Sequence, residues 1–197
     1  PYRYLDKERE KNTIMKPEFL QAARETAARS IVLLKNEKSF FPITKEKSLA
    51  VALIGPMVKD KVNQNGEWAG KGNREQSVSL YEGLTEKYAG TNVKFVYAQG
   101  CDLTTDNRDG FAEALATARR ADVVLAVMGE DFNWSGEAAS RSDIRLPGAQ
   151  QELLKELKKT GKPVGVVLMN GRPLDLSWED ANLDAIMEAW YLGTMSG

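Results

Sequence analysis

Short apolar runs alternate with amphipathic patterns along most of the chain. The runs fall at residues 49–54, 93–97, 123–128, 164–169 and 185–190, and helical patterns follow at 78–88, 110–120 and 148–159. A short apolar run between helical patterns is typical of a strand buried on both faces of a parallel sheet. The alternation therefore predicts an α/β fold, a three-layer α/β/α sandwich with a mostly parallel sheet of five to six strands.

The N-terminal part of the chain has a different pattern. Residues 1–16 are charged and aromatic without a period, so we expect a linker from an upstream domain. Residues 16–34 predict a helix, because Pro17 suits a first turn and one face is apolar. That face consists of Phe19, Leu20, Ala23, Ala27, Ile31 and Leu34. A loop is expected at 36–47, and the domain itself at 17–197, incomplete at its C-terminus because such a sheet needs a further helix and edge strand.

Composition limits the class of protein. The 197 residues are 42% hydrophobic and 28% charged, with a net charge of −1. These values are typical of a globular domain, and they provide no basic face for a nucleic acid. No apolar run approaches the roughly 20 residues that a membrane span needs. We therefore expect neither a nucleic-acid partner nor a membrane span.

The chain contains no histidine and a single cysteine, Cys101. The absence of histidine removes the commonest general base, every Ser-His triad and most zinc sites. One cysteine forms no disulfide within the chain. Proton transfer must then use carboxylates, lysine or tyrosine, and we expect no metal and no cofactor.

Candidate chemistry is concentrated where the run at 123–128 passes into a polar loop. In open parallel sheets, ligands bind outside the carboxyl ends of the strands, which is where this loop begins. We interpret Glu130 as a structural hydrogen-bonding residue, and we expect Arg141 and Asp143 to form a local ion pair. Glu137 lies in a loop of small residues. Its position alone leaves two interpretations open, a solvated side chain or a catalytic acid.

A second long loop, residues 57–77, is polar and rich in glycine. Loops of this length in compact domains are usually functional. Trp68 is interpreted either as a hydrophobic plug beneath this loop or as a stacking platform for a sugar ring, and Trp134 has the same two interpretations. Trp178 and Trp190 are assigned to packing. The glycines lack the spacing of a phosphate-binding loop, which disfavours a nucleotide-binding protein.

Several segments resemble a known family. They are AARETAARSIVLLKNE (22–37), VALIGP (51–56), ADVVLAVMGE (121–130), GEAASRSDIRLPGAQQELLKEL (136–157), GKPVGVVLMNGRPL (161–174) and AIMEAWYLGTMSG (185–197). In this order and spacing they resemble the second, α/β-sandwich domain of glycoside hydrolase family 3, most closely its bacterial β-glucosidase branch. The resemblance covers about residues 17–197.

This resemblance implies a function divided between two domains. A barrel-like first domain supplies the nucleophilic Asp, and the second supplies the general acid/base from a segment like E-A-S-S-R-[ST]-D. Here the segment is GEAASRSD, so the role falls on Glu137, and Gly136 stands where the family often has His. The resemblance also implies substrate contacts from Trp68 and Trp134, and from the side chains of Arg141 and Asp143.

The implied protein is a retaining, exo-acting β-glucosidase that removes terminal glucose from a β-glucoside or oligosaccharide. Its partners are that substrate and the missing barrel domain, and its location is periplasmic or secreted. The chain alone is expected to be inactive. The alternative is a non-catalytic carbohydrate-binding or scaffold domain, in which Glu137 is solvated and the aromatic residues bind sugar. We expect the loops at 63–74 and 132–142 to be the least ordered internal segments.

Overall fold

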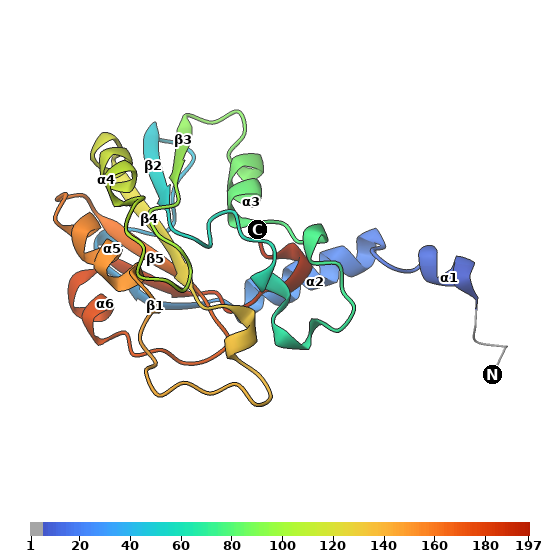
Figure 1. Ribbon diagram of the computed structural model, residues 1–197. Coiled ribbons are helices and arrows are strands. Elements are labelled where there is room, and N and C mark those ends of the chain that lie inside the picture. Colours follow the sequence, from blue (N-terminus) through green and yellow to red (C-terminus); the bar gives the residue numbers. More distant parts are fainter. Residues whose placement is uncertain (1–5) are drawn as a thin grey trace.

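The computed structural model describes residues 6–197, which form a six-stranded sheet with helices on both faces (Figure 1). The strands lie in the order β1-β6-β5-β4-β2-β3. All neighbours are parallel except β1 and β6, which are antiparallel. The bounds are β1 Val32–Asn36, β2 Leu49–Ile54, β3 Val93–Ala98, β4 Val123–Gly129, β5 Val164–Met169 and β6 Ala185–Glu188. The predicted mostly parallel α/β sandwich is confirmed.

Six α-helices accompany the sheet in the described residues. They are α1 Lys7–Lys11, α2 Pro17–Ser30, α3 Leu80–Lys87, α4 Phe111–Arg120, α5 Gln150–Lys158 and α6 Ser177–Asn182. Helices α4 and α5, together with the segment around α6, pack on one face of the sheet. Helix α3 and the loop after β1 pack on the other face. The short helix α6 was not predicted from the sequence.

The core is divided into two by the central strands β4 and β5. Side chains alternate across each strand, so Ala126 and Met128 face α5 while Leu125 and Val127 face the α3 side. Leu154 of α5 is fully buried in the first cluster. Burial of such a leucine stabilises the fold by about 1.5–3 kcal/mol. Both faces of β4 and β5 are therefore covered, as their uninterrupted apolar sequences predicted.

The predicted helix at 16–34 was wrong at its C-terminal end. Helix α2 ends at Ser30, and residues 32–36 form β1 instead of the end of a helix and the start of a loop. Apolar residues at the end of α2 match a helical period and a strand equally well, so the local pattern did not separate the two. Pairing of β1 with β6 decided it, an example of tertiary structure overriding propensity. Strand β6 also ends at Glu188, two residues before its predicted end.

The N-terminal segment extends away from the sheet (Figure 1). Helix α2 packs against the 3-10 turn Gly193–Met195, and Ala27 is its only buried residue. The predicted linker at 1–16 includes α1, whose first turn is capped by the Asp6 carboxylate, and its residues 1–5 lie outside the described part. Within residues 6–197, no helix has both the length and the apolarity needed to cross a membrane.

Candidate functional site

The carboxyl end of β4 is organised by Glu130, which is completely buried. Its Oε1 accepts a hydrogen bond from Arg141 Nη1 at 2.6 Å, and its Oε2 accepts one from Arg172 Nε at 3.1 Å. The Glu130 carbonyl oxygen accepts a hydrogen bond from the Tyr191 hydroxyl at 3.0 Å. A buried carboxylate needs such partners, because an unpaired buried charge is costly. Glu130 therefore has the structural hydrogen-bonding role expected from the sequence.

The expected ion pair between Arg141 and Asp143 is not formed. Arg141 turns inward to Glu130, and its guanidinium lies 4.5 Å from the centre of the Trp134 ring. Asp143 instead accepts two side-chain hydrogen bonds from Arg145, at 2.9 and 2.6 Å. These bonds hold the pKa of Asp143 well below its usual range. Arg141 thus ties the far end of the loop to the strand from which the loop departs.

The loop after β4 packs against the long loop after β2. The backbone N–H of Phe132 donates to Asn63 Oδ1 at 2.8 Å, and the Arg74 guanidinium lies 3.8 Å from the centre of the Phe132 ring. Arg74 also donates to the carbonyl oxygens of Val62 and Gly66, at 2.7 and 3.0 Å. Two segments about 70 residues apart in sequence are therefore joined at the carboxyl edge of the sheet.

The two loops also lie close together at Gly136, next to Glu137. A Cβ atom placed at Gly136 would lie 2.7 Å from Glu67 Cγ and 3.3 Å from Trp68 Nε1, and Gly136 has a φ of 103°. No side chain fits there without displacing Glu67, and the backbone conformation favours glycine. Glycine at this position is therefore explained by the contact with Glu67 and Trp68.

Glu137 lies at the exposed tip of this arrangement. Its side chain is exposed, and no hydrogen bond or ion pair to its carboxylate is found among residues 6–197. Ala138, the next residue, has a φ of 59°. A carboxyl group in this position is accessible to a molecule that reaches the loop. The Glu130–Arg141 ion pair joins the two ends of this loop, and Gly136, just before Glu137, lies close to Glu67.

The two candidate aromatic residues differ in exposure. Trp68 is 74% exposed, so its interpretation as a hydrophobic plug was wrong. Trp134 is partly buried beneath the Arg141 guanidinium. Trp178 packs against the core, as assigned. The exposed indole of Trp68 leaves a flat apolar surface beside Gly136, the residue that precedes Glu137.

A second buried acid, Glu188, lies beneath the site at the end of β6. Burial, assisted by the nearby negative charge of Glu130, raises the pKa of Glu188 to about 7. The Trp190 backbone N–H donates to Glu188 Oε1 at 2.9 Å, and Asn170 Nδ2 donates to its Oε2 at 3.4 Å. Asn170 Oδ1 has no partner in the described structure. Glu188 is thus held in a site that favours its neutral form.

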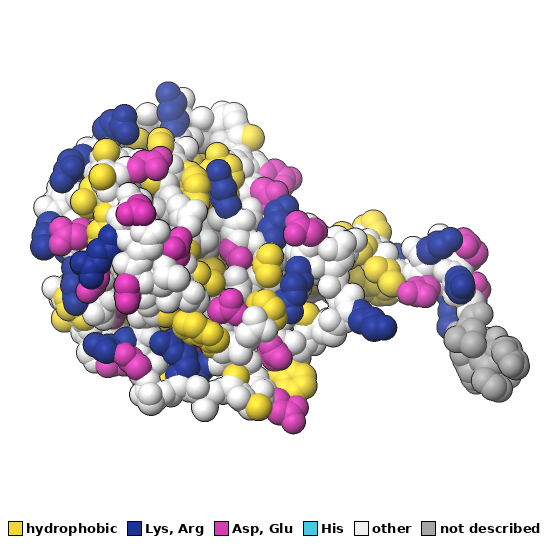
Figure 2. All heavy atoms as spheres, in the orientation of Figure 1, with side chains coloured by type: hydrophobic (Ala, Val, Ile, Leu, Met, Phe, Trp, Pro, Cys, Tyr) yellow, Lys and Arg dark blue, Asp and Glu magenta, His cyan; other side chains and the backbone are white. Residues whose placement is uncertain are grey.

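The sequence patterns missed Glu67, Arg172 and Glu188 at this site. One signal was available for Arg172, which lies three residues after the end of a buried strand, in the segment NGRP. The other two had no local signal. Charged side chains of both signs are interspersed over the face in Figure 2, so no single-sign patch marks the site on that face. Within the described residues, no cluster of three or more His, Cys, Asp or Glu side chains is arranged to hold a metal ion.

Comparison with known proteins shows to which protein family the chain belongs. The family model for the glycosyl hydrolase family 3 C-terminal domain matches residues 31–197. The chain belongs to this family. The resemblance in the sequence is therefore confirmed, and the sheet with its loop at the carboxyl end of β4 is the fold of this domain.

Individual relatives are enzymes with longer chains. A beta-xylosidase of Formosa agariphila is 38% identical over 184 residues, covering 91% of this chain and 25% of the relative. A periplasmic beta-glucosidase of Salmonella typhimurium is 38% identical over 195 residues, covering 89% of this chain and 25% of the relative. A solved beta-glucosidase from Listeria innocua, in complex with isofagomine, has a TM-score of 0.90 and 32% identity, over all of this chain and 26% of that one. The chain spans about a quarter of the length of these proteins.

Proposed function

We propose that this chain is the acid/base-bearing domain of a retaining exo-β-glucosidase. The observation that carries the proposal is the placement of Glu137: an exposed carboxyl, without a partner among residues 6–197, on a loop anchored by the buried Glu130–Arg141 pair and set beside the exposed Trp68. A retaining glycosidase uses two carboxyl groups about 5–5.5 Å apart, and one of them protonates the leaving oxygen. We assign that role to Glu137 and the nucleophile to a domain outside this chain.

The same proposal includes the side chains that contact the substrate. Trp68 offers its indole face to the apolar C–H face of a sugar beside Glu137. Trp134 and Arg141 form the adjoining wall, in which the stacked guanidinium keeps the indole in place. Asp143 pairs with Arg145 at the end of the loop that is farther from β4 in the sequence. Removal of terminal β-linked glucose is proposed because one group of relatives are beta-glucosidases.

The domain plan and location are further parts of the proposal. Residues 1–16 are assigned as the connection from an upstream barrel-like domain, and residues 17–197 as the sandwich domain. The extended position of α1 and α2 supports a connecting role (Figure 1). A periplasmic or secreted location is proposed from the Salmonella relative, which is a periplasmic protein.

The decisive test replaces Glu137 by Ala in the full-length protein that contains this chain. Hydrolysis of a β-glucoside with a poor leaving group should slow by roughly 10²–10⁴-fold, because that oxygen needs a proton in the transition state. A dinitrophenyl glucoside should be affected much less at its first step. Added azide should then restore turnover and yield a β-glycosyl azide, since azide attacks without a general base.

Asp131→Asn is the matched control, because Asp131 lies on the same loop and only caps its 3-10 turn. It should not show the dependence on leaving group. If Glu137→Ala slows all substrates equally and azide has no effect, the acid/base role does not belong to Glu137. Comparison of aryl β-glucoside with aryl β-xyloside hydrolysis tests the glucose assignment, because relatives of both kinds exist.

The chain by itself should not hydrolyse aryl β-glucosides, because the proposed nucleophile is absent. Turnover that survives repurification and disappears in Glu137→Gln would refute this. The exposed Trp68 also favours a second candidate, a non-catalytic carbohydrate-binding domain. Isothermal titration of the chain with cello-oligosaccharides separates the two: micromolar binding that is lost in Trp68→Ala and unchanged in Glu137→Gln favours the binding domain.

A further inference from the structure

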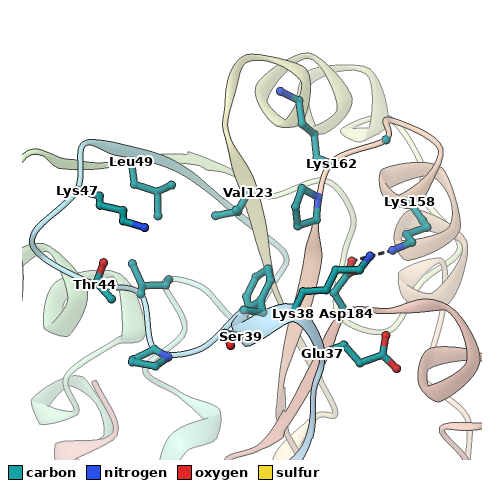
Figure 3. Close-up of a pocket in the computed structure, with 15 residues that line it drawn as sticks. Glu37, Lys38, Ser39, Thr44, Lys47, Leu49, Val123, Lys158, Lys162 and Asp184 are labelled. Atoms are coloured by element: carbon teal, nitrogen blue, oxygen red, sulfur yellow. Dashed lines mark hydrogen bonds and ion pairs between the residues drawn. The ribbon is translucent and has the colours of Figure 1, made fainter.

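A cavity of about 410 Å³ opens at the amino ends of the parallel strands, the opposite edge of the sheet from Glu137 (Figure 3). Leu49 at the start of β2, Val123 at the start of β4 and Pro163 just before β5 form one side. The loop after β1 forms the other. This volume is within the range of cavities that bind small molecules, about 300–1,000 Å³.

The floor of the cavity is apolar, and hydrogen bonds from neighbouring side chains hold its backbone in place. The Phe40 ring packs on β5 at Gly165, where any side chain would collide with it. Asn36 holds the backbone of Phe41 through two hydrogen bonds of 2.9 Å, one donated and one accepted. The Tyr88 hydroxyl donates to the Ile43 carbonyl oxygen at 2.5 Å. Side chains outside the cavity thus hold the loop at Phe41 and Ile43, on either side of Pro42, which makes the apolar surface around Phe40 a preformed one.

The rim of the cavity is cationic. Four lysines line it, Lys38, Lys47, Lys158 and Lys162, against only two carboxylates, Glu37 and Asp184. The charges therefore leave an excess of two positive charges at neutral pH. Clefts lined by one sign of charge attract ligands of the opposite sign.

The Asp184 carboxylate at the rim already has hydrogen-bond and ion-pair partners. Lys158 and Lys38 lie 2.7 and 3.5 Å from the Asp184 carboxylate, as Figure 3 shows, and the Val164 N–H also donates to it at 2.9 Å. Burial works against ionisation of Asp184, but these partners together keep its pKa below the usual value. Asp184 is therefore a charged, satisfied part of the wall and does not compete for a further cation.

Two lining lysines, Lys47 and Lys162, have no ion pair or hydrogen bond to their ammonium groups within residues 6–197. In Figure 3 the Lys162 side chain extends away from Leu49 and Val123. The Lys47 side chain lies next to Leu49, and its ammonium group points toward the side of the cavity on which Val123 lies (Figure 3). Of the two unpaired ammonium groups, the one of Lys47 lies beside the apolar floor, where it is complementary to one carboxylate carried on a flat apolar body. A phosphate ion would satisfy Lys47 but leave the floor around Phe40 and Val123 unfilled.

We propose that this cavity binds a small aromatic carboxylate, with its ring on the Phe40 floor and its carboxylate on Lys47. The site is separate from the proposed sugar site, and its existence does not depend on that function. The test uses this chain and 2-naphthoate as the probe, followed by amide chemical shifts in ¹H–¹⁵N NMR. Saturable shifts should be confined to the lining residues that carry an amide N–H and their neighbours, namely 37–41, 43–47, Leu49, Val123, Lys158, 161–162 and Asp184.

Lys47→Gln should weaken binding of 2-naphthoate by roughly 3- to 10-fold, the range for a partly exposed charged contact. Lys45→Gln is the matched control, because Lys45 is two residues away but lies over the Tyr88 ring instead of lining the cavity. It should change affinity by less than about twofold. Neutral 2-naphthamide should bind more weakly than 2-naphthoate, and inorganic phosphate more weakly still.

Three results would overturn the proposal. One is the absence of saturable shifts, or shifts centred on Trp68 and Glu137 instead of the cavity. Another is equal weakening by Lys45→Gln and Lys47→Gln, which would indicate a general charge effect. The last is phosphate binding as tight as 2-naphthoate, which would indicate a site for inorganic anions with no use for the apolar floor.

Discussion

Replacement of Glu188 by Gln should stabilise the chain at alkaline pH. Glu188 is 5% exposed at the end of β6, and burial together with the charge of Glu130 raises its pKa to about 7 from an ordinary value of 4.5. Its folded environment therefore favours the neutral acid. Gln keeps the neutral form at every pH and still offers an oxygen to the Trp190 N–H.

The sign and size follow from linkage. At pH values between the pKa of Glu188 in the unfolded chain and its pKa in the folded chain, the native state binds more protons than the unfolded state. The contribution of Glu188 to the unfolding free energy is therefore fully present below about pH 4.5 and is lost as the pH rises through 7. A difference of about 2.5 pKa units corresponds to about 3 kcal/mol at 1.36 kcal/mol per unit. Wild type should lose about this much from Glu188 between acid and alkaline pH, and Glu188→Gln should not.

The assay is urea unfolding of both proteins at pH 5 and pH 8. The difference in unfolding free energy, Glu188→Gln minus wild type, should be larger at pH 8 by about 2–3 kcal/mol. Glu86→Gln is the control for the change in net charge, because Glu86 is an exposed acid of α3 and its replacement alters the charge of the chain in the same way. A difference for Glu188→Gln that is equal at the two pH values would refute the reasoning.

Three further predictions concern the core and the loops. Glu130→Ala should lower the unfolding free energy by about 3–5 kcal/mol, because it leaves two arginines without their buried partner; a urea midpoint close to wild type would contradict this. Leu154→Ala should cost about 2–5 kcal/mol by the same measurement, since Leu154 is fully buried, and a loss under about 1 kcal/mol would show that the core relaxes around it. In hydrogen exchange, amides of 63–74 and 132–142 should exchange faster than those of 123–128, despite the contacts between the two loops; equal protection would show that these contacts close both loops.

Most of the sheet was predictable because each parallel strand is buried on both faces. Burial of that kind requires an uninterrupted apolar run, which is visible locally, and β4 and β5 have such runs. The edge strand β1 was not predictable, since its apolar residues remain 43–53% exposed at Val32, Leu33 and Leu34 and match a helical period equally well. Pairing with β6, about 150 residues away, has no local signature.

At the candidate site, local sequence and long-range structure contributed different things. The sequence by itself determined that Glu137 follows a buried strand in a loop of small residues, since the end of an apolar run and the residues after it are neighbours in the chain. Only the tertiary structure decided that Glu130 holds Arg141 and Arg172, and that Glu67 fills the space over Gly136. These contacts join residues 11 to about 70 positions apart, and their partners are chosen by the packing of loops at one edge of the sheet. Periodicity reports which face of an element is buried, but it carries no information on which distant side chain covers it.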